Sequence, residues 1–169
     1  MATTFTKIAA VTVGSGGSSS IAFSSIPSTY TDLCLKVSLR SNASRINEDL
    51  LVSFNGSTSN RTWTFLEGNG SSASAASGTD GRFSTFNANT STANTFGNAE
   101  LYIPNYAGSN YKSVSIDTVT ENNATSAYTE IETALWSNTA AITSITCTLA
   151  FGTLFMQYST ATLYGISKS

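Results

Sequence analysis

The sequence predicts a single all-β domain, an antiparallel, jelly-roll-like β-sandwich of two sheets with about nine or ten strands. Apolar and polar residues alternate with a period of two through most of the chain. Clusters of glycine, proline, asparagine and serine separate these runs at intervals of roughly 8 to 12 residues, a spacing typical of a sandwich or barrel. Residues 1–169 have the length of one domain, and an immunoglobulin-like sandwich is the alternative architecture.

The first strands are defined by the turns that end them. The run 4–13 ends at Gly14, the first residue of a glycine-rich turn, and the short run 20–23 ends before a turn that contains Pro27. The run 31–40 alternates most regularly, with leucines and valine on one face. We therefore expect three strands before residue 41.

A hairpin is expected next. The run 48–54 ends at Asn55-Gly56, a dipeptide that favours the tight turn of a β-hairpin, and the run 61–67 returns along it. Residues 68–94 give the weakest signal, since the core of this segment is built from Gly, Ser and Ala. We interpret 68–94 as a long, flexible, exposed loop, with one short strand near 82–86 as the only regular structure that it could contain.

The second half predicts five more strands, each an alternating run bounded by turn residues: 98–103, 111–120, 128–137, 142–151 and 155–166. Within 128–137, alternation places Ile131 and Leu135 on one face and Glu130 and Glu132 on the other. We expect the apolar pair to face the core and the two glutamates to lie on a solvated face.

Composition argues against several functions. The net charge is −2, and the eight basic residues are scattered, so no basic stretch could neutralise a run of phosphates. No apolar run approaches the roughly 20 residues of a membrane span, and the N-terminus lacks the pattern of a signal peptide. Roughly a third of the residues are Ser or Thr, which is neutral polar material suited to strands and turns. We expect no nucleic-acid partner, no membrane association and synthesis in a cytoplasm.

Catalytic chemistry is not predicted. The chain contains no histidine, which removes Ser-His-Asp and Cys-His catalysis and histidine-containing zinc sites. Neighbouring Glu48 and Asp49 point to opposite faces of a strand, so they cannot easily converge as a glycosidase pair. Calcium between loop groups such as Asp80 and backbone carbonyls stays open, although no EF-hand-like spacing occurs. We expect no enzyme activity, no metal site and no cofactor.

The two cysteines are expected to be unpaired. Cys34 is on the face of its strand opposite to the leucines, together with Lys36, whereas Cys147 is in phase with the apolar residues of its own strand. The sulfurs would then point to different places, so a disulfide is disfavoured.

Aromatic residues flank the loop-rich middle of the chain. Aromatic side chains beside polar loops can bind a sugar or a partner protein, and Phe83, Phe86, Tyr106 and Tyr111 are the candidate exposed interface. Tyr106 and Tyr111 bracket a short polar loop and are the strongest candidates for exposure. Trp63, Phe65 and Phe96 are interpreted instead as ordinary core residues.

Several segments, spread over nearly the whole chain, resemble small structural proteins of tailed bacteriophages, notably those of cyanobacterial and marine phages. These segments are Phe5–Ala9, Val11–Gly14, Ile26–Leu33, Ser53–Ser57, Asn98–Tyr106, Trp136–Asn138 and Tyr158–Ile166. They are made of strand and turn residues and contain no catalytic signature, so the resemblance assigns no chemical role to any residue.

The resemblance implies a virion protein, either a capsid decoration (cement) protein that bridges major capsid subunits or a module of a tail fibre. The first is favoured, because fibres usually contain a long repetitive shaft and this chain has none. The alternative is a tail-fibre or lectin-like module that binds host surface glycan. The scarcity of charges and the many hydroxyls are also compatible with a homotrimer on the capsid surface, although a dimer or a monomer fits these residues nearly as well.

Overall fold

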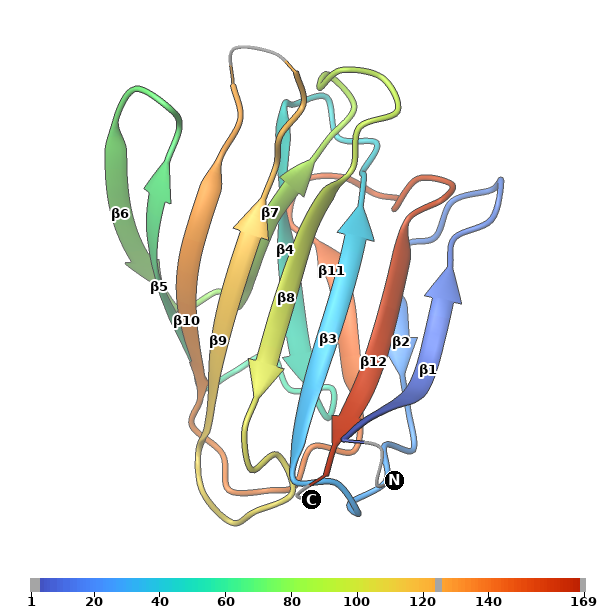
Figure 1. Ribbon diagram of the computed structural model, residues 1–169, viewed down its shortest axis with the longest axis vertical. Helices are drawn as coiled ribbons and strands as arrows, with labels where there is room; N and C mark the ends of the chain where they lie inside the picture. The colour runs from blue at the N-terminus through green and yellow to red at the C-terminus, as the bar shows by residue number, and fades with distance from the viewer. Residues whose placement is uncertain (1–3, 124–125, 168–169) are drawn as a thin grey trace.

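Two antiparallel sheets form the structure of residues 4–123 and 126–167, the part of the chain that this computed structural model describes (Figure 1). The eight-stranded sheet contains, from edge to edge, β1 (Phe5–Thr12), β12 (Thr160–Ile166), β3 (Asp32–Leu39), β8 (Gly97–Ile103), β9 (Lys112–Val119), β10 (Thr129–Trp136), β5 (Arg61–Gly68) and β6 (Ala73–Gly78). The four-stranded sheet contains β2 (Ile21–Phe23), β11 (Ile145–Leu149), β4 (Asn47–Phe54) and β7 (Arg82–Asn87). The expected all-β, antiparallel sandwich is confirmed, with twelve strands in the described residues rather than nine or ten, and the strand order is compatible with a jelly roll.

The apolar core fills the space between the two sheets. Alternation places one set of side chains inward, as in β9, where Val114 and Ile116 are buried while Ser113 and Ser115 are exposed. From the smaller sheet, residues such as Phe54 meet this face. No helix suitable for crossing a membrane occurs in the described part of the chain.

The segment 68–94 contains two strands, β7 where a short strand was expected and β6 where only a loop was expected. In β6, Ala73–Gly78 is exposed along its whole length, yet it pairs with β5 through the backbone, which needs no large side chain. In β7, all six residues are buried. The short strand expected near 82–86 is therefore confirmed as β7, but the expectation that the whole segment is exposed was wrong there, because β7 is covered on both faces.

The loop that follows β7 is held in place by hydrogen bonds from one buried cation, Arg40. The Arg40 guanidinium donates five hydrogen bonds to this loop: to the carbonyl oxygens of Asn89, Ser91, Thr92 and Thr95, and to the Thr95 hydroxyl. A guanidinium has enough donors in a fixed geometry to satisfy several carbonyls at once. A loop made mainly of small polar residues can thus still be ordered.

The unequal size of the sheets leaves part of the larger one without a covering layer. Strand β7 is an edge of the smaller sheet and packs against β8, β9 and β10. Beyond it, β5 and β6 extend past the smaller sheet (Figure 1). The inner face of β5 therefore meets an open space rather than a second sheet.

Both cysteines are free, so the prediction of unpaired thiols is confirmed. Cys34 is fully buried although it lies on the outer face, where Tyr102 and Tyr164 are its neighbours on the adjacent strands. Burial raises the pKa of Cys34 to about 11 and that of Cys147 to about 12, so both are protonated thiols near neutral pH.

Candidate functional site

A groove opens where the larger sheet extends past the smaller one, and it has a volume of about 330 Å³. One wall is β5, which contributes Trp63, Phe65 and Glu67. The opposite wall is β4, which contributes Asn47 and Asp49. Aromatic and carboxylate side chains therefore face the same space from two different sheets.

A buried ion cluster forms the floor of this groove. The Arg82 guanidinium donates to Glu132 Oε2 at 2.8 Å and to both oxygens of Glu130 at 2.8 and 2.9 Å. It also lies 3.3 Å from Asp49 Oδ1. Glu130 and Glu132 are each only 1% exposed, so these ion pairs cross between the sheets with almost no water around the carboxylates.

The position of these glutamates corrects the sequence analysis. Glu130 and Glu132 face inward, and Ile131 is 64% exposed, so the phase of β10 is the opposite of the expected one. Trp136 has the same phase as the glutamates and is buried in the core beside Phe54. The free energy gained by burying this large ring and by forming the ion pairs to Arg82 exceeds what burial of Ile131 and Leu135 would give.

The aromatic wall packs directly on the cluster. The ring planes of Trp63 and Phe65 are within 3° of parallel, with centroids 5.6 Å apart. Arg82 lies over both rings, 4.4 Å from the Phe65 centroid and 5.4 Å from that of Trp63, as in a cation–π contact. The Trp63 indole N–H donates to Asp80 at 2.6 Å. A Cβ at Gly78 would come within 2.5 Å of the indole ring, so β6 can approach Trp63 only with glycine there.

The cluster has one cation for three carboxylates, and burial of those carboxylates shifts their protonation. Burial raises the pKa of Glu130 to about 7 and that of Glu132 to about 8, because the charge of Arg82 only partly offsets the lost hydration. Burial also raises the pKa of Asp49. Oε1 of Glu132 has no hydrogen-bond partner, which is consistent with a carboxyl that is easily protonated.

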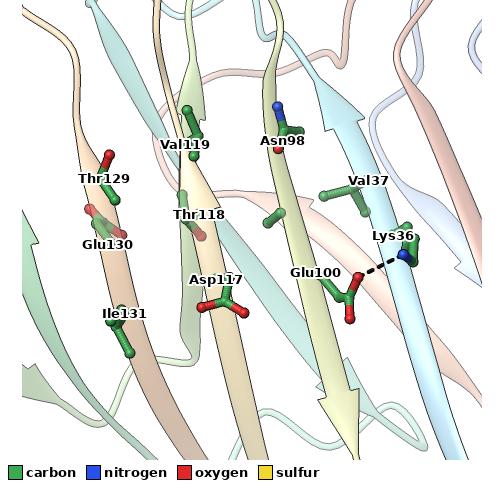
Figure 2. Close-up of a pocket in the computed structure, with 11 residues that line it drawn as sticks. Lys36, Val37, Asn98, Glu100, Asp117, Thr118, Val119, Thr129, Glu130 and Ile131 are labelled. Carbon is green, nitrogen blue, oxygen red and sulfur yellow. Dashed lines mark ion pairs between the residues drawn. The ribbon is translucent and has the colours of Figure 1, made fainter.

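A second, wider depression of about 570 Å³ lies on the outer face of the eight-stranded sheet, over β3, β8, β9 and β10 (Figure 2). The Lys36–Glu100 ion pair, at 2.7 Å, crosses it, with Asp117 and Ile131 farther along the same face (Figure 2). Both partners of this pair are about half exposed, so the pair contributes little to stability. The depression has no aromatic lining, and its two buried polar residues, Thr118 and Glu130, are already hydrogen-bonded to Ser84 and Arg82.

Most of the predicted exposed interface is instead core. Phe83, Phe86 and Tyr106 are buried, whereas Tyr111 is 56% exposed. Phe83 packs edge-on against Phe54, Phe86 stacks on another core ring, and the Tyr106 hydroxyl donates to a backbone carbonyl. The expected cluster of four exposed aromatics therefore does not exist, because its phenylalanines belong to a buried strand and Tyr106 turns inward from its loop.

Trp63, Phe65 and Phe96, which the sequence assigns to the core, are instead partly exposed. Period-two phase correctly placed Trp63 and Phe65 on the inner face of β5, but phase does not show where a covering sheet ends. Glu48 and Asp49 do point to opposite faces, as expected. Glu48 is buried and accepts four backbone N–H bonds, while Asp49 faces the groove. Within residues 4–123 and 126–167, no three acidic or cysteine side chains are grouped as metal ligands would be.

A scan against protein-family models finds no match, and a search of curated proteins finds no similar sequence.

The raised pKa values predict how stability changes with pH. In the folded chain Glu130 and Glu132 have pKa values of about 7 and 8, whereas the ordinary value is 4.5. Between about pH 4.5 and pH 8 the folded chain therefore binds more protons than the unfolded chain. This contribution to stability is present below about pH 4.5 and is lost as pH rises toward 8. Urea unfolding should show a lower free energy at about pH 8.5 than at about pH 5, with a smaller difference in the Glu130→Gln/Glu132→Gln double variant. An unchanged pH dependence in that variant would contradict the assignment.

Removal of the central cation should be costly and pH-dependent. Arg82→Met leaves buried carboxylates without their counter-charge, so we expect a loss of about 3–5 kcal/mol near pH 8. The loss should be smaller near pH 5, where the glutamates can be protonated. The measurement is denaturant unfolding of both proteins at the two pH values. An equal loss at both would mean that Arg82 acts through packing on Trp63 and Phe65 rather than through charge.

Proposed function

We propose that this protein is a structural component of a tailed-bacteriophage particle, a decoration (cement) protein that lies on the outside of the capsid and stabilises contacts between major capsid subunits. The resemblance described for the strand and turn segments is the starting point. One structural observation supports it: the outer face of the eight-stranded sheet has no second layer over it and exposes several large apolar side chains.

The outer face has an apolar centre of the kind that marks a protein interface. Strand register sets Leu66 of β5 directly beside Ile131 of β10, and Val119 lies on neighbouring β9. These side chains are 57%, 64% and 38% exposed. Around them the face carries many hydroxyl-bearing residues that can form hydrogen bonds to a partner, and its nearest charge is Asp117, which pairs in register with Ile131.

The proposal assigns no enzymatic role. Both glutamates of β10 are held by Arg82, and Glu130 lines the groove whereas Glu132 does not. Two carboxylates that act on a glycosidic bond must flank that bond from both sides. The cluster is therefore a poor arrangement for hydrolysis and a good one for fixing the groove wall.

The two edges of the larger sheet support self-assembly as a ring. Adjacent strands are antiparallel throughout this eight-stranded sheet, so its edge strands β1 and β6 run in opposite directions. Strand β1 of one copy could then pair antiparallel with β6 of the next copy around a closed axis. In β6, Ala73–Gly78 has none of the charges or prolines that usually protect an edge.

Sedimentation equilibrium tests the proposed homotrimer. We expect a mass near three times 17.7 kDa, because closed symmetry satisfies both edges at once. A mass of one chain, both in solution and after binding to capsids, would refute the trimer without affecting the proposal of capsid attachment.

Attachment itself is tested on particles. Quantitative mass spectrometry of purified virions should find this chain in hundreds of copies, as a shell protein requires, rather than in the handful expected of a fibre. Binding of the recombinant protein to capsids that lack it should fall by about tenfold or more in Leu66→Lys and Ile131→Lys, because each places a charge in the apolar interface. Thr139→Lys, an exposed position outside the strands, is the control and should bind normally. Normal binding of both outer-face variants would exclude this face.

A further inference from the structure

We infer that the groove between β5 and β4 is a binding site for a neutral saccharide. This role goes beyond attachment to a shell, and it depends on the inner side of the overhanging strands rather than on the outer face. The groove volume of about 330 Å³ is at the lower end of the roughly 300–1,000 Å³ typical of small-molecule sites, which suits one or two sugar rings.

The aromatic wall supplies the apolar half of such a site. Trp63 and Phe65 are only partly buried, so ring surface is accessible from the groove, and Tyr128 lines it as well. The C–H faces of a sugar ring are apolar and pack on aromatic side chains, while its hydroxyls remain available for hydrogen bonds. Because the planes of Trp63 and Phe65 are nearly parallel, the two rings have the same orientation toward the groove.

The polar lining supplies the other half. Asp49, Asp80 and Glu67 offer carboxylate oxygens, whereas Asn47 and Arg45 offer N–H donors, all around the same space. A sugar hydroxyl both donates and accepts, so this mixture of acceptors and donors suits it. The result is the combination typical of ligand sites, a mainly aromatic surface with a few convergent polar groups.

The charge of the lining selects against anions. Four acidic residues and two arginines line the groove, and one of the arginines, Arg82, is already paired with three carboxylates. A phosphate, sulfate or sialic acid would be repelled by the acidic side chains, and the two arginines are too few to neutralise both those side chains and the ligand. A neutral sugar meets no such penalty.

The ion cluster gives a physical reason to regard this groove as built for a ligand. Replacing a buried ion cluster by well-packed apolar residues is often neutral or stabilising, so stability alone does not require Arg82, Glu130 and Glu132. What the cluster does is hold a guanidinium against Trp63 and Phe65 and thereby fix the wall. A fixed wall lowers the entropy lost on binding.

Binding is tested with a panel of neutral oligosaccharides of glucose, galactose, mannose and N-acetylglucosamine, with sialylated and sulfated members for comparison. A neutral member that binds is then titrated in solution. The chain has two tryptophans, and Trp136→Phe leaves Trp63 as the single tryptophan, which can be excited selectively. That change also removes a buried indole N–H that lacks a partner. We expect a saturable change in Trp63 fluorescence that is insensitive to salt, since no charge pairing is involved.

Strand β6 provides a matched pair of variants. Ala76 pairs with Phe65 and shares its groove-facing side, whereas its neighbour Ala75 pairs with Leu66 on the outer face. Both positions are exposed, so lysine should be tolerated at each without loss of fold. Ala76→Lys should weaken saccharide binding by about tenfold or more by placing its chain over the groove, and Ala75→Lys should leave the affinity within about twofold.

Three results would overturn the inference: no neutral saccharide binds at millimolar concentration, only anionic glycans or a basic peptide bind, or Ala76→Lys binds as tightly as the unchanged protein. Leu66→Lys and Ile131→Lys, the variants designed to abolish capsid attachment, should bind saccharide normally. Failure of attachment and failure of saccharide binding are therefore distinguishable in the same set of proteins.

Discussion

A four-stranded sheet stacked on an eight-stranded one must leave part of the larger sheet's inner face without an apolar cover, because sheets bury only the area over which they overlap. Here the overlap ends at β7. The strand at that boundary is buried along its whole length, yet two of its residues, Arg82 and Thr85, also line the groove beside the core. Arg82 meets this constraint with a charged head that pairs with β10 and a planar face that packs on Trp63 and Phe65.

Buried polar side chains have a similar organising role elsewhere in the chain. Glu48 accepts backbone N–H bonds from the segment after β11, Arg40 satisfies carbonyls of the loop after β7, and Lys112 donates to two carbonyls of the loop before β9. Each charge replaces hydration with several backbone hydrogen bonds. A chain with free thiols and long Ser/Thr-rich connections thereby orders its loops by hydrogen bonding rather than by covalent links.

Features that depend on local period-two alternation could be predicted from the sequence. Features that depend on how the second sheet covers the first could not. The class of fold, the free thiols and the inward phase of Trp63 and Phe65 follow from local alternation. The phase of β10 does not follow from it, because both faces of this strand carry apolar residues: Ile131 and Leu135 on one, Ala134 and Trp136 on the other. The ion pairs to Arg82 that help to decide the phase link residues about 50 positions apart, which local alternation does not show. The large ring of Trp136 was the available signal. The exposure of Trp63 and Phe65 could not be predicted, because it depends on where the smaller sheet ends.

The two proposed surfaces lie on opposite faces of the same strands, which makes them mutually compatible. Along β5, Leu66 points to the outer face, while its neighbours Phe65 and Glu67 line the groove. A protein attached to a shell through the outer face would therefore turn the groove away from the shell and toward solvent. The alternation that makes a strand two-sided would thus let one hairpin hold the particle on one side and contact a saccharide on the other. Neither surface needs a residue that the other uses.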